Sequence, residues 1–334
     1  MFSTIDTWHR DGSQVVAHSR LIHFRDTYGN ITFFWQDVCR LSVMRTLKDR
    51  RRKRLMGLSE IRQLLSGVRW IRASFYRIHS VLPDTVFFFF VNLLCKFSLI
   101  NVRVRYGSGG GYLYTDNERS RYASDRLRGL RLWHRGFSYR DTQLIEKYGL
   151  AFVDLDVGDV VIDCGANYGD VYFALASLGK QVNYVAIEPD PTVRTALEKN
   201  ITPDGRICGL ALGAQNDDSA AFFISGMSGD SSVVKPDIVE KEVLVPMQTL
   251  TTLIEAVGLQ KLGLLKLEAE GYEIEILRGA HDVLRRFRYV TVDGSAERHG
   301  IETLDDLRSI LEQYGFNLTH HSARYISALF DRGR

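Results

Sequence analysis

The sequence has few cysteines, and none is placed to build a metal site or a disulfide framework. Its four cysteines among 334 residues form no C-x-x-C pair and no cluster with histidine, so we predict no bound metal and no disulfide-stapled fold. Cys164 follows an apolar run and is predicted to be a small buried residue rather than a nucleophile. The first residues show no apolar run beside a basic start, so no signal peptide is readable. Together these features predict a reducing, cytoplasmic setting.

A hydrophobic run long enough to cross a bilayer is also missing. Residues 86–100 are the one membrane-like segment, but they number 15 and include Asn92 and Lys96, whereas a spanning helix needs about 20 apolar residues. We predict an apolar helix there and a basic helix over residues 41–80. The basic helix is either a solvated face beside the apolar helix or a surface that docks on anionic lipid, peripherally at the inner membrane surface.

Acidic residues are in the minority in residues 1–150, and basic residues are in the minority in the rest of the chain. Residues 1–150 hold 26 Lys and Arg against 12 Asp and Glu, a balance of +14. The remaining residues hold 43−26=17 basic and 40−12=28 acidic residues, a balance of −11. The basic half is expected to favour anionic surfaces such as phospholipid headgroups, nucleic acid or an anionic glycan. The acidic half argues against a catalytic domain that itself grips a phosphate backbone.

Phosphate-binding glycine motifs are absent too. The glycine run at 107–111 lacks the following Lys-Ser/Thr of a phosphate loop, so we predict a turn. Instead, an apolar run leads into an acid and a G-x-x-x-G spacing, in place of the G-x-G-x-x-G of dinucleotide sites. Glycines at a strand-to-helix turn let a ligand approach the backbone closely. The carboxylate before them suits a cationic ligand such as S-adenosylmethionine better than a ligand that carries phosphate. The predicted cofactor contacts of this turn are Asp163, Gly165, Ala166, Asn167 and Gly169.

A second apolar run ends in an acid at the position expected for ribose recognition. Glu188 follows Gly165 by 188−165=23 residues, close to the ~20 at which an acid grips ribose hydroxyls in nucleoside-binding α/β units. Pro189 stops this strand, and a helix is predicted to begin at Pro191. We therefore predict adenosine held across the strand tips by Glu188 and Pro189, with Ala211 at the tip of the third strand.

From about residue 151 the pattern alternates between strand and helix, which predicts a parallel sheet covered on both faces. We predict a basic, mainly helical extension over 1–136 and a catalytic domain over 137–334. Residues 213–248 form either an insertion that shapes a substrate pocket or a plain surface loop. The predicted strands are 103–106, 160–164, 183–188, 206–211, 263–268 and 288–293; the predicted helices are 137–150, 169–178, 191–199, 249–257, 272–286 and 302–314; a terminal hairpin is predicted from 315–319 and 325–330.

Two acids and a lysine lie at the tip of the fourth predicted strand. Lys266 and Glu268 point to the same face of an extended strand. Because Lys266 is costly to bury alone, we expect it to pair with Glu268 or Glu270. One alternative is a strand-tip salt bridge, with Glu270 capping the next helix. The other is that a carboxylate orients the cofactor's methionine end or an acceptor hydroxyl, which makes Lys266, Glu268 and Glu270 the catalytic candidates.

In combination, these motifs resemble the FkbM-type S-adenosylmethionine-dependent methyltransferases over roughly residues 140–300. The resemblance implies a seven-stranded Rossmann-like class I methyltransferase sheet whose last strand is antiparallel, and S-adenosyl-L-methionine as the cofactor. It also implies methylation of hydroxyls, often on sugars of glycolipids, polysaccharides or natural products. Members often carry Asp where this chain has Glu268. Position by position, Asp163, Gly165, Asn167 and Gly169 match the family's cofactor loop, Glu188 its ribose acid, and Lys266, Glu268, Glu270 and Gly271 its fourth-strand motif.

The expected function is O-methyl transfer to a hydroxyl of a sugar, glycolipid or polysaccharide, or of a small molecule. General-base candidates are Glu268, Glu270, Asp293 and His299, and the sequence does not choose among them. A nucleic-acid methyltransferase is the first alternative, but the fourth strand lacks the Asn/Asp-Pro-Pro-aromatic motif that holds a flipped base. The second alternative is a membrane-associated protein that binds the cofactor without catalysis.

Overall fold

The computed structural model describes residues 5–8, 14–18, 21–26, 29–34, 82–117, 119–225, 231–236 and 239–333. The chain divides into two compact units, Met1–Arg77 and Ile78–Arg334. In the first unit, four strands form an antiparallel sheet in chain order. The predicted basic helix over 41–80 lies outside the described residues. The four strands are β1 (Ile5–Trp8), β2 (Gln14–His18), β3 (Leu21–Asp26) and β4 (Gly29–Phe34).

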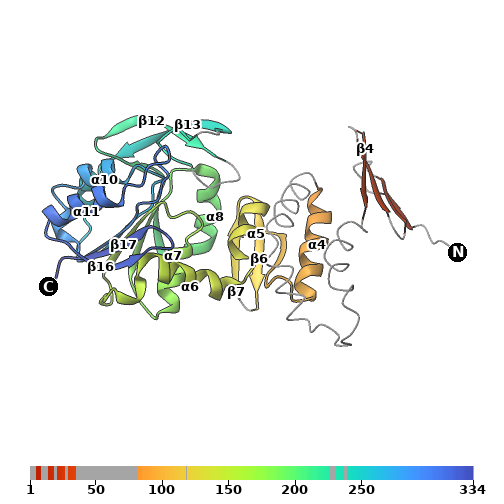
Figure 1. Ribbon diagram of the computed structural model, residues 1–334, viewed down its shortest axis with the longest axis horizontal. Coiled ribbons are helices and arrows are strands. Elements are labelled where there is room, and N and C mark those ends of the chain that lie inside the picture. Colours follow the sequence, from red (N-terminus) through yellow and green to blue (C-terminus); the bar gives the residue numbers. More distant parts are fainter. Residues whose placement is uncertain are drawn as a thin grey trace, which may run out of the picture. The chain divides into compact units, whose positions relative to one another are not determined.

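Figure 1 shows the helices and strands of the second unit. Its main sheet has seven strands in the order β10-β9-β8-β14-β15-β17-β16. Its first five strands pair in parallel, whereas β17 runs antiparallel to both β15 and β16. The predicted seven-stranded Rossmann-like sheet with an antiparallel last strand is confirmed. The strands are β8 (Val160–Cys164), β9 (Asn183–Ile187), β10 (Gly205–Cys208), β14 (Leu262–Leu267), β15 (Tyr289–Asp293), β16 (Asn317–Ser322) and β17 (Ser327–Asp331).

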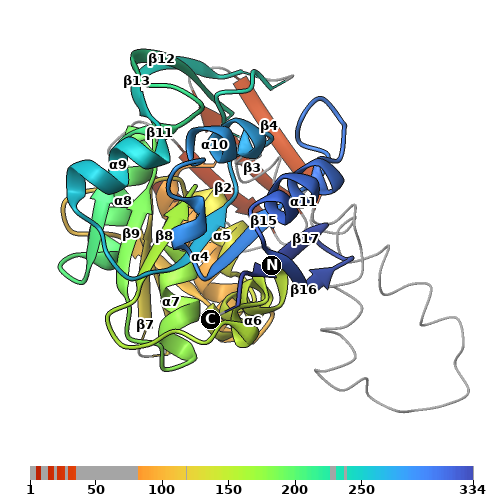
Figure 2. The ribbon, with the colours of Figure 1, turned by 90° about the vertical axis from the view of Figure 1, so that its left-hand side faces the viewer.

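Helices cover both faces of this sheet, with α10 and α11 on one side and α6 and α7 on the other (Figure 2). The two cores follow from the alternation of side chains along each strand. Ile162 and Leu265 face the first core, whereas their neighbours Val161 and Leu264 face the second. The helices are α6 (Phe137–Tyr148), α7 (Asp170–Ser177), α8 (Pro191–Ile201), α9 (Leu250–Val257), α10 (Glu273–Gly279) and α11 (Leu304–Gln313).

Most predicted elements of this unit are present within one to three residues, and two differ. The strand expected over 206–211 is divided, because β10 ends at Cys208 and Ala211–Leu212 forms β11 in another sheet. The helix expected over 272–286 ends at Gly279, a weak helix former, and a separate 3₁₀ turn follows at Leu284–Arg286.

The segment 213–248 is not a plain loop. It contains β12 (Asp217–Ile224) and β13 (Lys241–Gln248), which pair antiparallel and join β11 in a three-stranded sheet. Alternate residues of this hairpin, including Phe222 and Val245, build a small core of their own. The Gly/Ser/Asp-rich stretch between the strands hid this alternation in the sequence.

Residues 82–136 contain sheet where the sequence predicted mainly helix. The apolar helix expected at 86–100 is present as α4 (Asp84–Lys96), and the predicted strand is β5 (Arg103–Tyr106). The glycine run forms the predicted turn, in which the Gly107 amide donates to the Gly111 carbonyl at 3.0 Å. Of the helices in the described ranges, none is long and apolar enough to cross a membrane. The sequence missed β6 (Tyr112–Asp116), β7 (Arg119–Ala123) and α5 (Arg126–Trp133).

Candidate active site

The predicted cofactor turn connects β8 to α7 in a conformation that requires glycine. Gly165 and Gly169 have φ angles of 74° and 83°, and Asn167 between them has a φ of 51°. A Cβ atom on Gly165 would lie 2.0 Å from the backbone oxygen of Glu268. The amides of Gly165 and Ala166 both donate to the Ile187 carbonyl at 3.0 Å, so the turn is tied to the tip of β9. The turn is therefore held in place, and a ligand can approach its backbone closely at the carboxyl ends of the strands.

Asp163 and Lys266 form a buried ion pair beneath this turn. Lys266 Nζ lies 2.9 Å from Asp163 Oδ1, and the two side chains are 1% and 0% exposed. Nζ also donates to the carbonyls of Cys164 and Gly165 at 2.9 Å. Although burial alone would lower the pKa of Lys266, Asp163 and Glu268 raise it, so the ammonium stays charged. The pair therefore holds the base of the turn in shape.

A pocket opens above the turn, at the carboxyl ends of β8, β9 and β14. Five of the predicted cofactor residues line it: Gly165, Asn167, Glu188, Pro189 and Ala211. Two of the predicted catalytic residues line it as well: Glu268 and Glu270. The other predicted site residues lie outside its lining: Asp163, Ala166, Gly169 and Lys266. The topology thus brings together residues from three strand tips, which is where open α/β sheets bind their ligands.

Glu188 is buried at one end of the pocket with its carboxylate held by backbone amides. Its two oxygens accept from Asp190 N at 3.0 Å and Asn167 N at 2.8 Å. Burial raises the pKa of Glu188 to about 7, despite these amides and the neighbouring Arg128. Asn167 Oδ1 is buried and has no hydrogen-bond partner among the described residues. This end of the pocket therefore offers acceptors for a ligand that carries hydroxyl or ammonium donors.

Glu268 lies at the other end of the pocket between two lysines. Lys147 of α6 and Lys266 contact its two oxygens, Lys266 at 3.2 Å. Burial would raise the pKa of Glu268, but the two lysines hold it well below its usual value. Lys147 also pairs with Asp293 at 2.5 Å. Glu268 is therefore an ionised hydrogen-bond acceptor and a weak proton acceptor.

Glu270 lines the same pocket in a strained backbone conformation. Its φ is 52°, a region that non-glycine residues seldom adopt, and Gly271 follows with a φ of 92°. The carbonyl of Glu270 accepts from Ser232 Oγ at 3.2 Å, which ties this tip to the segment between β12 and β13. Glu273, the first residue of α10, binds this tip: its carboxylate accepts from Ala269 N at 2.6 Å and Gly271 N at 3.3 Å, while the N-cap residue Tyr272 makes no side-chain capping bond.

The comparison with protein-family models agrees with this geometry. Residues 163–318 match the model of the Methyltransferase FkbM domain. The chain contains an FkbM methyltransferase domain. That domain is characteristic of S-adenosylmethionine-dependent methyltransferases, and the predicted recognition is confirmed for residues 163–318.

Individual relatives of the FkbM domain are distant. A stretch of 236 residues is 23% identical to the AMB antimetabolite synthetase AmbE of Pseudomonas aeruginosa, and spans 58% of this chain and 11% of AmbE. Fibrillarin of Aeropyrum pernix, with natively bound S-adenosyl-L-methionine, is 12% identical at a TM-score of 0.36, over 69% of this chain and 99% of that one. A SAM dependent methyltransferase of Aquifex aeolicus is 12% identical at a TM-score of 0.34, over 57% and 95%. At this level the similarities carry no argument about function.

Sequence reasoning missed several charged groups around the FkbM pocket, among them Lys147 and Glu297. Lys147 precedes the matched residues and reaches Glu268 only because α6 packs on the sheet. Glu297 lies beyond β15, where its Oε1 accepts from Ser295 Oγ at 2.9 Å. Burial, with Asp293, Glu268 and Glu273 nearby, raises the pKa of Glu297 to about 7. Neither residue belongs to a local motif, so no spacing could have singled them out.

The two remaining general-base candidates have different surroundings. Asp293 is 2% exposed, and its Oδ1 accepts from Ser295 N at 2.9 Å and Ser295 Oγ at 2.6 Å. Its other oxygen pairs with Lys147, so both carboxylate oxygens of Asp293 already have partners within the protein. His299 lies exposed on the loop after β15, with a φ of 53°. Neither lines the pocket of the FkbM domain.

Proposed function

We propose that the FkbM domain transfers the methyl group of S-adenosylmethionine to a hydroxyl oxygen, on a sugar of a glycolipid or polysaccharide. The observation that carries this proposal is the presence of Glu188 and Glu268 in one pocket, on either side of the Gly165 turn. An acid at the second strand tip suits a ribose, and an ionised acid at the fourth suits an ammonium or an acceptor hydroxyl.

The residues present fit the cofactor. Glu188 has acceptor capacity beyond its two backbone amides, enough for the ribose hydroxyls. Asn167 Oδ1 supplies a further acceptor, and the absence of a side chain at Gly165 supplies space. Pro189 and Ala211 add apolar walls for the adenine. Asp163 serves the same site indirectly, because it holds Lys266 under the turn.

The bound cofactor would supply an electrophilic methyl group on its sulfonium, and the protein supplies position and proton handling. Glu268 orients a donor group, either the cofactor ammonium or the acceptor hydroxyl, and Lys266 and Lys147 keep it ionised. A proton acceptor works best with a pKa near the operating pH. Glu297 meets that condition but lies outside the lining of the pocket, whereas Glu270 lines the pocket itself. We place the general base among these two.

Nucleic acid fits this pocket less well than a neutral sugar. Glu188, Asp190, Glu268 and Glu270 all line it, and their negative charge opposes a phosphate backbone. A small-molecule hydroxyl acceptor is kept as a second candidate, because AmbE, to which part of the chain is similar, is an antimetabolite synthetase. A cofactor-binding protein without catalysis is the third.

Transfer of labelled methyl from S-adenosylmethionine into fractionated cell extract separates these candidates. Label in a glycolipid or polysaccharide fraction would support the proposal, and label in small metabolites would support the second candidate. Label in RNA or DNA would contradict both. Calorimetric binding of S-adenosylmethionine with no label in any fraction would favour the non-catalytic protein.

We also propose that the basic front half brings the protein to an anionic membrane surface. The balance of +14 over residues 1–150 supports this, since each basic residue near an anionic bilayer contributes about 1 kcal/mol. The full chain should co-sediment with vesicles containing anionic lipid and not with neutral vesicles. Equal binding to both kinds would contradict an electrostatic anchor.

A further inference from the structure

One pocket-lining residue comes from outside the matched FkbM domain. Arg128 belongs to α5, 163−128=35 residues before the match begins. Its guanidinium carbon lies 5.4 Å from the ring centroid of Tyr168, a residue of the cofactor turn. Its Nε is buried and has no hydrogen-bond partner among the described residues. A buried donor without a partner on the wall of a pocket points to a ligand group or a neighbouring anion.

The start of α5 is bonded directly to the cofactor turn. The Tyr168 hydroxyl lies 3.0 Å from Ser124 Oγ and accepts from Asp125 N at 3.4 Å. Asp125 in turn caps α5, where its side chain accepts from the Arg128 amide at 2.7 Å. Tyr168 is fully buried. The position of Arg128 relative to the turn is therefore fixed by a short chain of hydrogen bonds.

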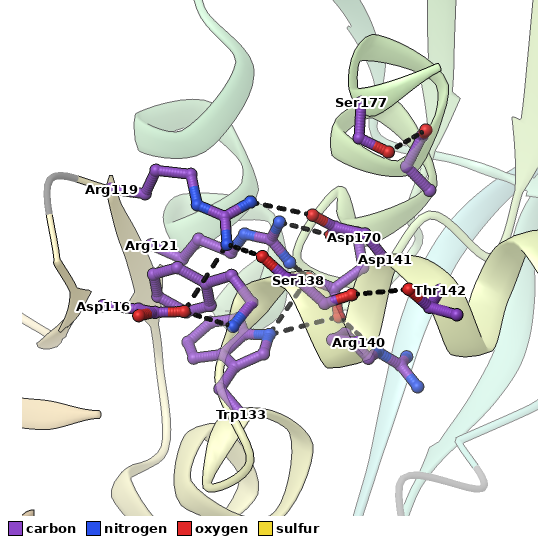
Figure 3. Close-up of polar contacts among 12 residues, drawn as sticks. Asp116, Arg119, Arg121, Trp133, Ser138, Arg140, Asp141, Thr142, Asp170 and Ser177 are labelled. Atoms are coloured by element: carbon purple, nitrogen blue, oxygen red, sulfur yellow. Dashed lines mark hydrogen bonds and ion pairs between the residues drawn. The ribbon is translucent and has the colours of Figure 1, made fainter. Parts of the chain in front are cut away.

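The end of α5 is fixed as well, by a buried network that joins β7, α5, α6 and α7 (Figure 3). Trp133 Nε1 donates to Asp170 Oδ1 at 3.0 Å. Arg121 of β7 bonds the same oxygen at 2.8 Å and Asp141 of α6 at 2.6 Å. Arg140 completes the set, with Nε 2.8 Å from Asp170 Oδ2. Since Asp170 begins α7 directly after the turn, α5 and the turn form one rigid body.

Arg128 acts on Glu188 across the pocket. Both residues line it, and the positive charge of Arg128 opposes the burial that raises the pKa of Glu188. The other groups that face Glu188 are Asp190 at the start of α8, whose charge raises that pKa, and the Asp190 and Asn167 amides, which lower it. Arg128 is thus a side-chain cation on the pocket wall that favours the ionised form of Glu188.

We propose that Arg128 is a positioning residue of the cofactor site: it closes the adenosine end of the pocket and acts as the counter-ion of Glu188 when the ribose is bound. The inference rests on the proposed assignment of Glu188 to the ribose. An ionised Glu188 can accept hydrogen bonds from both ribose hydroxyls. A protonated Glu188 has one acceptor site fewer and an O–H donor that needs a partner of its own. Arg128 therefore sets how much of the protein can bind the cofactor at neutral pH.

The test is calorimetric binding of S-adenosylmethionine to the full chain between pH 6 and pH 8.5. The wild-type affinity should rise with pH through a midpoint near 7, because the carboxylate forms there. Arg128→Gln should weaken binding about fivefold at pH 7, by moving the midpoint about one pH unit higher. Arg128→Lys keeps the charge and should keep the midpoint. Titration of the ligand is common to all variants, so differences between them report on the protein.

Arg131→Gln is the matched control, because Arg131 is on the same helix and does not line the pocket. It should bind as the wild type does. If Arg128→Gln does not fold, as judged by circular dichroism, the wild type still provides a test. Its binding at pH 7 should release about half a proton, measured in buffers of different ionisation enthalpy.

Two outcomes would overturn the inference, and they can be told apart. An unchanged affinity and pH midpoint in Arg128→Gln, or no proton release by the wild type, would remove the role of Arg128 and leave the proposed function standing. A wild-type protein that binds no S-adenosylmethionine at any pH would remove both proposals.

Discussion

The carbonyl oxygen of Glu268 occupies the space that a side chain on Gly165 would need. A Cβ at Gly165 would lie 2.0 Å from that oxygen, and the Gly165 φ of 74° already disfavours any other residue. The tips of β8 and β14 therefore touch through their backbones.

Gly165→Ala is expected to separate the two strand tips and abolish binding of S-adenosylmethionine. Gly179→Ala is a matched control, since Gly179 has a φ of 73° and nothing within 4 Å of the added Cβ. The control should cost only the backbone strain, about 1 kcal/mol of unfolding free energy, and should bind normally. Urea unfolding and calorimetry measure both effects. Normal cofactor binding by Gly165→Ala would contradict the role of the contact.

Asp163→Ala should destabilise the protein as well as weaken cofactor binding. It leaves the ammonium of Lys266 buried without its nearest carboxylate, a loss of about 3–5 kcal/mol of unfolding free energy. Asp163→Ala combined with Lys266→Met removes both charges and should recover part of that loss. Denaturant unfolding of the two single variants and the double variant gives the coupling energy. Additive effects would mean that the pair does not stabilise the turn.

Glu188→Ala should weaken binding of S-adenosylmethionine, because it removes the carboxylate that accepts from the ribose. One or two lost charge-assisted hydrogen bonds correspond to roughly 2–4 kcal/mol of binding free energy. Glu198 is on the exposed side of α8, so Glu198→Ala is the control and should bind as the wild type does. Calorimetry at pH 8, where Glu188 is ionised, provides the measurement. A wild-type affinity in Glu188→Ala would place the ribose elsewhere.

Lys147→Met should destabilise the protein in a pH-dependent way. The pKa of Glu268 is depressed in the folded state, so its ion pairs stabilise the fold above the ordinary glutamate value of about 4.3, and this stabilisation is lost as the pH falls below it. The cost of Lys147→Met should be about 1–3 kcal/mol at pH 7 and should shrink toward pH 3.5. Lys180→Met is the control, since Lys180 donates to the Val153 carbonyl. Equal pH dependence in both variants would contradict the prediction.

Arg121→Met should cost far more stability than Arg119→Met, although both arginines contact Asp141 from the same strand. The Arg121 side chain is 2% exposed and pairs with two buried aspartates, so its removal should cost about 3–5 kcal/mol. The Arg119 side chain is 44% exposed, so its removal should cost about 0–1 kcal/mol. Thermal unfolding measures the difference. Similar costs for the two variants would argue against a buried clamp.

The sequence predicted those parts of the site that are local in the chain. The turn from Asp163 to Gly169 carries its own conformational requirements, and Glu188 follows at a spacing set by one helix and one strand. The pairing of Lys266 with an acid was expected from the cost of burying a charge. Its closest partner is nevertheless Asp163, on the neighbouring strand, because parallel pairing places these two residues side by side.

Residues brought in by packing could not be predicted in the same way. Lys147 and Arg128 precede the cofactor turn, on helices whose placement depends on buried contacts such as those of Trp133. The strands β6 and β7 are five residues long each and rich in Arg and Tyr, so their alternation is short and amphipathic. Such segments form recognisable strands only when another part of the protein packs against one of their faces.

The rigid attachment of α5 to the cofactor turn has a practical consequence for anyone who shortens this protein. The matched region begins at Asp163, inside β8, and excludes the helix that carries Lys147 as well as the one that carries Arg128. A fragment cut at that boundary would lack the start of β8 and would expose the side of α7 that Arg121 and Trp133 cover. Expression should therefore retain every residue from Ile78 onward.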